Sequence, residues 1–118
     1  MLYVTGVAFP DFETVAYDAA TGARSWARRF NGPGSSYAFA PQVAVGPRGH
    51  TVYIAGGPGR YIATVAYNAA TGATQWARLH RSGGIALAVS PVSGAVYVTG
   101  SAVRSATFDD YITIAYHG

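Results

Sequence analysis

The chain has 118 residues, half of them hydrophobic and 11% charged, which fits one small folded domain and excludes a disordered polar segment. It contains no cysteine, so disulfides, thiolate zinc sites and cysteine nucleophiles are excluded. The formal net charge is +3, and all eight basic residues are arginines.

Short apolar segments rich in Val, Ile, Tyr and Thr alternate with clusters of Gly, Pro and Ser, which is typical of strands joined by turns. In chain order we expect strands at LYVTG (2–6), TVAY (14–17), the segment after Ala23, QVAV (42–45), VYIAG (52–56), TVAY (64–67), TQWARL (74–79), LAVS (87–90), VYVTG (96–100) and TIAY (113–116).

No segment shows ten or more residues of helical periodicity. The best helical candidate, YDAATGARSWARR from Tyr17, contains Gly22 in its middle. A tight hairpin fits this stretch better, because Asp18 can cap its own turn and Gly22 can take a positive φ.

A long phrase occurs twice: VAYDAATGARSWAR from Val15 returns as VAYNAATGATQWAR from Val65, and a third copy begins as TIAYHG. Four antiparallel strands recurring every forty to fifty residues are the signature of a β-propeller blade. The fold class is therefore predicted as all-β: one partial β-propeller domain of about two and a half four-stranded blades, an incomplete ring. We expect an incomplete blade over 1–40, a complete blade over 41–84 and an incomplete blade over 85–118.

The stretch from Ala16 to Trp26 resembles the tryptophan-docking motif of pyrroloquinoline-quinone-type β-propeller repeats: Ala, x, Asp, two residues, Thr, Gly, three residues, Trp. The docking residues that the resemblance implies are Ala16, Asp18, Thr21, Gly22, Trp26, Ala66, Asn68, Thr71, Gly72 and Trp76. Kelch repeats are the nearest competitor, but only one copy has their Gly-Gly, at Gly56.

The resemblance implies that each tryptophan packs between blades on the turn of the next copy, so that Trp26 packs on the turn at 66–72. Trp76 would pack on the third copy, where His117 replaces the Asp and the Thr-Gly is missing. Similar repeats are common in secreted proteins of high-GC bacteria, which implies an extracellular or cell-envelope location. The first residues, MLYVTG, show no signal-peptide pattern.

No catalytic, cofactor-binding or metal site is expected. Quinoprotein dehydrogenases of the resembling family hold a quinone and a calcium ion in a full ring of blades, and the predicted strands are too few for one. We expect Asp11 and Glu13 to be surface acids, and Asp109-Asp110 to lie in a solvated loop before the last strand. The three histidines, at 50, 80 and 117, share no metal-ligand spacing.

Two glycine-rich pieces, GPGSS from Gly32 and GGPGR from Gly56, are expected to be inter-strand loops, because they lack the Lys-Ser/Thr ending of a phosphate loop. The arginines stand singly apart from Arg28-Arg29, whereas nucleic-acid surfaces cluster them. No apolar run approaches the roughly 18 residues of a membrane helix. Neither nucleic acid nor a membrane is therefore an expected partner.

The function expected from the sequence is a non-enzymatic scaffold or a protein- or ligand-binding module. Its expected partners are further propeller blades, or other copies that associate through open blade faces. Two alternatives stay open. The chain could belong to a quinone-dependent oxidoreductase propeller, or it could be a lectin-like propeller whose exposed Tyr and Arg contact sugar rings.

Overall fold

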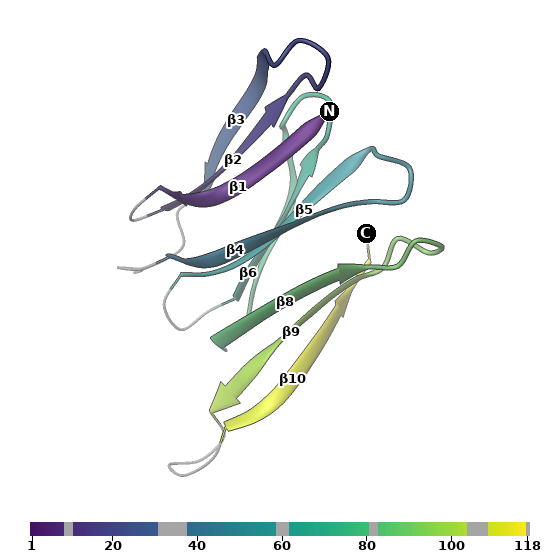
Figure 1. The fold of residues 1–118 in the computed structure, drawn as a ribbon. Helices are drawn as coiled ribbons and strands as arrows, with labels where there is room; N and C mark the ends of the chain where they lie inside the picture. The colour runs from purple at the N-terminus through teal and green to yellow at the C-terminus, as the bar shows by residue number, and fades with distance from the viewer. Residues whose placement is uncertain (9–10, 31–37, 59–61, 81–82, 104–108, 118) are drawn as a thin grey trace.

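Ten β-strands make up the regular structure of the described residues in a computed structural model, which covers residues 1–8, 11–30, 38–58, 62–80, 83–103 and 109–117 (Figure 1). The strands are β1 (Leu2–Ala8), β2 (Asp11–Tyr17), β3 (Arg24–Phe30), β4 (Ala38–Val45), β5 (Thr51–Pro58), β6 (Ile62–Asn68), β7 (Thr74–His80), β8 (Gly83–Val89), β9 (Val96–Val103) and β10 (Asp109–Tyr116). The described part of the chain contains no helix, so the all-β prediction is confirmed.

The strands form three antiparallel sheets that follow one another along the chain (Figure 1). The N-terminal sheet has the order β1-β2-β3, the central sheet β4-β5-β6-β7 and the C-terminal sheet β8-β9-β10. Each sheet is built from consecutive hairpins, because short turns bring neighbouring strands together directly. The strands β1, β4 and β8 lie side by side where the three sheets approach one another.

Two strands begin earlier than the sequence indicates. β4 begins at Ala38 and β8 at Gly83, whereas the strands predicted there begin at 42 and 87. Each of these strands contains a register shift, between Phe39 and Gln42 in β4 and between Gly83 and Ala86 in β8. Proline lacks a backbone N–H, and a bulge in an edge strand such as β4 accommodates it at Pro41.

Two loop predictions are wrong. Asp109 and Asp110 do not precede the last strand but begin it, since they pair with Val103 and Ala102 of β9. Gly56, Gly57 and Pro58 continue β5, where they pair with residues of β6 and β4, and Gly59 and Arg60 of the same piece fall outside the described residues. In both places strand pairing with a neighbour outweighs the turn-forming composition of the segment.

The hairpin between β2 and β3 has the predicted turn chemistry. One carboxylate oxygen of Asp18 accepts the backbone N–H groups of Ala20 and Thr21, at 2.8 and 3.1 Å, and Gly22 has a φ of 75°. The hairpin between β6 and β7 repeats this geometry with an amide in place of the carboxylate. The Asn68 side chain accepts the corresponding N–H groups at 2.9 and 3.1 Å.

The two inner strands of the central sheet, β5 and β6, are buried on both faces, and alternate residues along each strand point to opposite sides. On β5, Val52 and Ile54 belong to the core shared with the N-terminal sheet, whereas Tyr53 and Ala55 belong to the core shared with the C-terminal sheet. Every residue of β6 from Ile62 to Tyr67 is buried. The molecule therefore has two separate hydrophobic cores on the two sides of one sheet.

Candidate functional site

Trp26, on β3, lies against the turn of the central sheet. Its side chain is 6% exposed, and its indole N–H donates to the backbone carbonyl of Ala69 at 2.9 Å. A Cβ atom placed on Gly72 would lie only 2.7 Å from Cδ2 of the indole. The indole ring therefore packs directly on the backbone of Gly72. The φ of Gly72 is 77°, which also favours glycine at this position.

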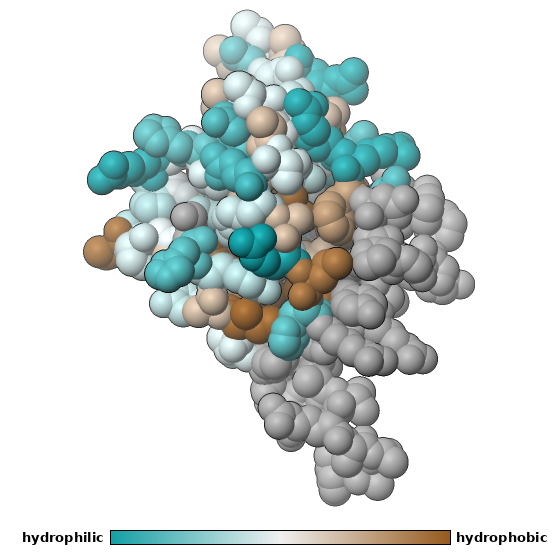
Figure 2. Space-filling view, turned by 180° about the vertical axis from the view of Figure 1, so that it is seen from behind, coloured by the Kyte–Doolittle hydropathy of each residue, from teal (hydrophilic) through white to brown (hydrophobic). Residues whose placement is uncertain are grey.

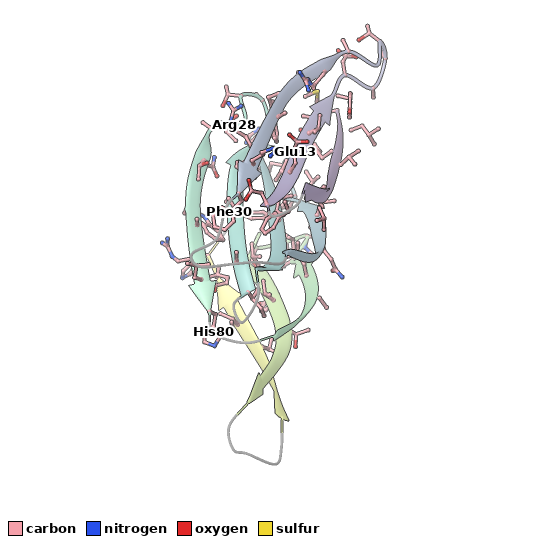
Figure 3. The ribbon with its side chains drawn as sticks, turned by 90° about the vertical axis from the view of Figure 1, so that its left-hand side faces the viewer. Glu13, Arg28, Phe30 and His80 are labelled. Atoms are coloured by element: carbon pink, nitrogen blue, oxygen red, sulfur yellow. The ribbon has the colours of Figure 1, made fainter. Side chains whose placement is uncertain are left out.

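Two further side chains of the N-terminal sheet, Tyr3 and Arg28, complete this contact. The ring of Tyr3 lies 6.0 Å from that of Trp26, and its hydroxyl donates to the Ala69 carbonyl at 3.4 Å. Arg28, labelled in Figure 3, donates to the carbonyl of Thr71 at 3.1 Å. The carbonyls of Ala69 and Thr71 in this turn therefore accept hydrogen bonds from side chains of another sheet.

The remaining motif residues shape the two turns and their bases. Thr21 and Thr71 each accept a backbone N–H two residues later, at 3.2 Å in both copies. The two motif alanines are fully buried and stand directly opposite the tryptophans across the ladder, in the pairs Ala16–Trp26 and Ala66–Trp76. The small methyl group leaves room beside each indole.

Trp76, on β7, occupies the same position in the second copy. Its ring lies 6.0 Å from Tyr53 and 5.5 Å from Tyr116, much as Trp26 lies between Tyr3 and Tyr67. The two tryptophans differ in what packs on them. Among the described residues no turn packs on Trp76, and its side chain is partly exposed.

An open groove of about 470 Å³ takes the place of that turn. It is lined by Trp76, Arg78, Ala115, Tyr116 and His117, and the Arg78 guanidinium carbon stands 5.6 Å from the centre of the indole ring. In the first copy the equivalent groups, the indole N–H of Trp26 and the guanidinium of Arg28, donate to backbone carbonyls. Burial raises the pKa of the Tyr116 phenol above its ordinary value of 10.0. The groove therefore presents an indole N–H and a guanidinium, the same two donor groups that Trp26 and Arg28 present in the first copy.

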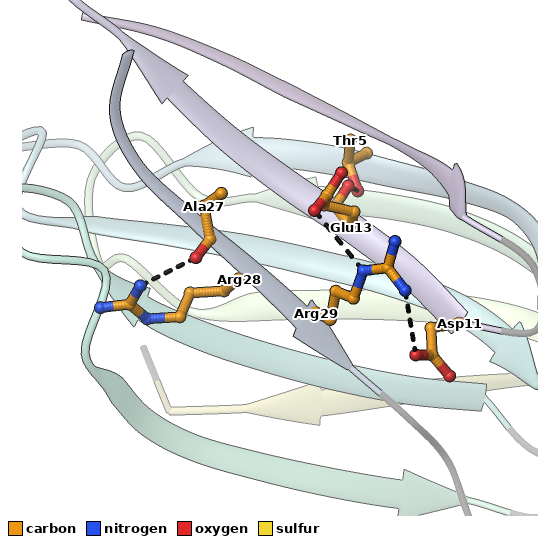
Figure 4. A network of polar contacts seen from close by, with 6 residues as sticks. All are labelled: Thr5, Asp11, Glu13, Ala27, Arg28 and Arg29. Carbon is orange, nitrogen blue, oxygen red and sulfur yellow. Dashed lines mark hydrogen bonds and ion pairs between the residues drawn. The ribbon is translucent and has the colours of Figure 1, made fainter.

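The carboxylates of Asp11 and Glu13 both lie near the guanidinium of Arg29. Arg29 lies 3.9 Å from the carboxylate of Asp11 and 3.6 Å from that of Glu13, as Figure 4 shows. The Arg29 side chain is 57% exposed, so this is a surface ion-pair cluster and not an enclosed carboxylate pair. Sequence reasoning missed Arg29, although the hairpin register places it directly opposite Glu13.

The three histidines lie on three separate segments of the chain. His50 lies in the turn before β5, His80 ends β7 and His117 follows β10. No group of three His, Cys, Asp or Glu residues that could hold a metal ion occurs in the described part of the chain. A second, shallower hollow of about 270 Å³ lies between the turns that precede β5 and β9, with Arg48 and His50 on its wall. The glycine-rich piece from Gly32 falls outside the described residues.

Within the described ranges, no helix is long and apolar enough to cross a membrane. Comparisons of the chain with protein-family models, with curated proteins and with solved structures found no match.

Proposed function

We propose that the chain is a segment of a β-propeller of the tryptophan-docking type and acts as a non-enzymatic binding scaffold. In this proposal each of the three sheets is a blade, and the N-terminal and C-terminal blades lack their inner and outer strands. The observation that carries it is the seating of Trp26 on the turn at 68–72, which joins two sheets through a sequence motif that occurs twice.

The binding surface in this proposal is the groove at Trp76 together with the edge of β10. Within the described residues β10 pairs with β9 alone, so its other edge offers backbone N–H and C=O groups to a further strand. In the central sheet the corresponding edge of β6 is covered by β7, which follows directly from the Asn68 turn.

The groove and edge suit one kind of ligand: a polypeptide with an Ala-Ala-Thr-Gly turn followed by an extended strand. Carbonyls of the turn would accept from Trp76 and Arg78, as those of Ala69 and Thr71 accept from Trp26 and Arg28. The strand would then add to β10 by main-chain hydrogen bonds. In a longer array, the next part of the repeat supplies this segment; a separate peptide can supply it in a test.

A synthetic peptide of residues 69–80 with Trp76→Phe tests the proposal, because its sequence is that of the turn and strand that cover Trp26 and β6. Added to the full chain, it should give a saturable blue shift of tryptophan emission as the Trp76 indole leaves water. The same peptide with Gly72→Ala is the matched control, since a methyl group on that glycine meets the indole.

A chain carrying Trp76→Leu should lose the response, although Trp26 still fluoresces. Equal responses to the two peptides, or no response to either, would contradict the proposed docking.

A further inference from the structure

Each end of the stack of sheets presents an outward face with a distinct set of side chains. The N face consists of Leu2, Val4, Val15 and Tyr17, and the C face consists of Tyr97, Thr99, Thr113 and Ala115. Their neighbours along the strands, such as Ala16 and Val98, are buried against the central sheet, so the four residues of each face point away from it. Leu2, Val4 and Tyr97 are 56%, 48% and 43% exposed. Figure 2 shows hydrophobic side chains reaching the surface among hydrophilic ones.

The N face has a buried counterpart inside the molecule. In the central sheet, Val52 stands opposite Tyr67 and Ile54 opposite Val65, just as Leu2 stands opposite Tyr17 and Val4 opposite Val15. The central set is 0–2% exposed, because the N-terminal sheet covers it. The N face is therefore built like a surface that another sheet covers.

The C face matches the surface that provides such a cover. Tyr3 stands opposite Ala16 and Thr5 opposite Thr14 in the N-terminal sheet, and the C face has the same four residue types in the same register. The two threonine hydroxyls of each set lie 3.2 Å apart. In the N-terminal sheet this surface packs on the central sheet, with Thr14 and Ala16 only 1% and 0% exposed.

We infer that the C face of one copy of this chain binds the N face of a second copy, head to tail. The contact would repeat the one that the N-terminal sheet makes with the central sheet inside each chain. Because the two faces differ, the contact is heterologous: each molecule uses one face for each neighbour. This inference rests on the two faces and holds whether or not the sheets are propeller blades.

The chemistry of the faces favours burial. None of the eight side chains carries a charge, and the hydroxyls of Thr99 and Thr113 lie 3.2 Å apart, so one of them can donate to the other when the face is buried. Glu13 borders the N face, but its carboxylate already has Arg29 as a partner. Covering the exposed Leu2, Val4 and Tyr97 then supplies the hydrophobic driving force.

Two single variants and their mixture test the inference by sedimentation velocity on the full chain. Val4→Glu blocks the N face and Ala115→Glu blocks the C face, while Val92→Glu, at a turn residue that is 92% exposed, is the control. Wild type and control should show a mass that rises with concentration above 12.3 kDa. Each blocked variant should stay at the monomer mass, and their equimolar mixture should form a dimer through the two intact faces.

Three results would overturn the inference: a wild type that stays monomeric at tens of micromolar, an Ala115→Glu variant that still self-associates, or a mixture that stays monomeric. Circular dichroism and the emission of the buried Trp26 report whether each variant is folded. Leu2→Glu and Tyr97→Glu provide a second pair for the same measurements. The groove at Trp76 shares only Ala115 with the two faces, so Tyr97→Glu blocks the C face without changing a residue of that groove and keeps the two outcomes separable.

Discussion

The indole N–H of Trp26 donates to the carbonyl of Ala69, which lies 43 residues further along the chain. The two residues belong to sheets that share no strand pairing. The bond therefore holds one sheet on the next, and it does so through a side chain that is almost completely buried.

Replacing Trp26 with alanine should lower the free energy of unfolding by about 3–5 kcal/mol, because a large buried ring and its hydrogen bond are lost together. Trp76→Ala should lower it by less, since that ring is partly exposed and no described turn covers it. Urea denaturation of both variants, followed by circular dichroism, measures the difference. Equal losses would show that the turn on Trp26 adds nothing to the stability of the chain.

The two turn glycines should respond differently to alanine. Both have a positive φ, so each substitution strains the backbone by about 1–2 kcal/mol. A methyl group on Gly22 meets nothing within 4 Å, whereas one on Gly72 would meet the Trp26 ring. Gly72→Ala should therefore lower the free energy of unfolding by a further ~1–3 kcal/mol. Thermal denaturation of the two variants side by side checks this, and similar melting temperatures would contradict the close contact.

A buried hydroxyl of the central sheet lacks the partner that its counterparts have. Thr14 lies 3.2 Å from the hydroxyl of Thr5, but the residue opposite Thr64 is Ala55, and Thr64 has no hydrogen-bond partner in the described structure. The Thr64 hydroxyl lies near the Tyr116 phenol and partly offsets the rise that burial causes in the pKa of that phenol.

Thr64→Val should consequently raise the free energy of unfolding by about 1 kcal/mol, because it removes an unsatisfied buried hydroxyl without changing the volume. Thr14→Val is the matched control and should lower it by about 1 kcal/mol, because it breaks a hydrogen bond. Chemical denaturation distinguishes the signs. A destabilised Thr64→Val would mean that the hydroxyl has a partner after all.

Asp18 should make the first turn sensitive to acid. The backbone N–H groups of Thr21 and Ala20 stabilise its carboxylate and hold its pKa below the ordinary value of 3.8. A pKa that is lower in the folded state contributes stability above the unfolded pKa, and this contribution is lost as the pH falls through the folded pKa. An NMR titration of the Asp18 carboxyl carbon should have its midpoint below 3.8.

Asp18→Asn should keep the turn and remove this pH dependence, because Asn68 makes the same two bonds in the second copy without a charge. A midpoint at or above the ordinary value would show that the two backbone bonds do not form in solution.

Local chemistry in the sequence was enough to predict the strands and turns. Asp18 and Gly22 specify a turn within five residues, and a repeated phrase gives the same turn twice. The seating of Trp26 could be placed as well, because a family resemblance links the tryptophan to the next copy's turn. Each of these features depends on residues close together or on a spacing that recurs.

The remaining features depend on pairing between strands, which composition does not report. Asp109 and Asp110 look like loop residues, yet β9 recruits them into β10. Pro41 looks like a strand boundary, yet the bulge in β4 lets the strand continue on both sides of it. The bond from Arg28 to Thr71 and the ion pairs of Arg29 likewise require the register of two hairpins and the contact between two sheets.

Because the two faces of each sheet carry different residues, further repeats can be added to such a protein in one orientation. Each sheet has one face that combines a tyrosine with threonine and alanine, as in Tyr3, Thr5, Thr14 and Ala16 or Tyr53, Ala55, Thr64 and Ala66. Its opposite face is aliphatic with one tyrosine, so every sheet carries both halves of the contact. A tandem duplication of the coding sequence for one repeat would therefore join compatible surfaces at once, before any mutation adapts them. Stability in such an array rises with the number of neighbour contacts, and new units are accommodated at either end by the same eight positions.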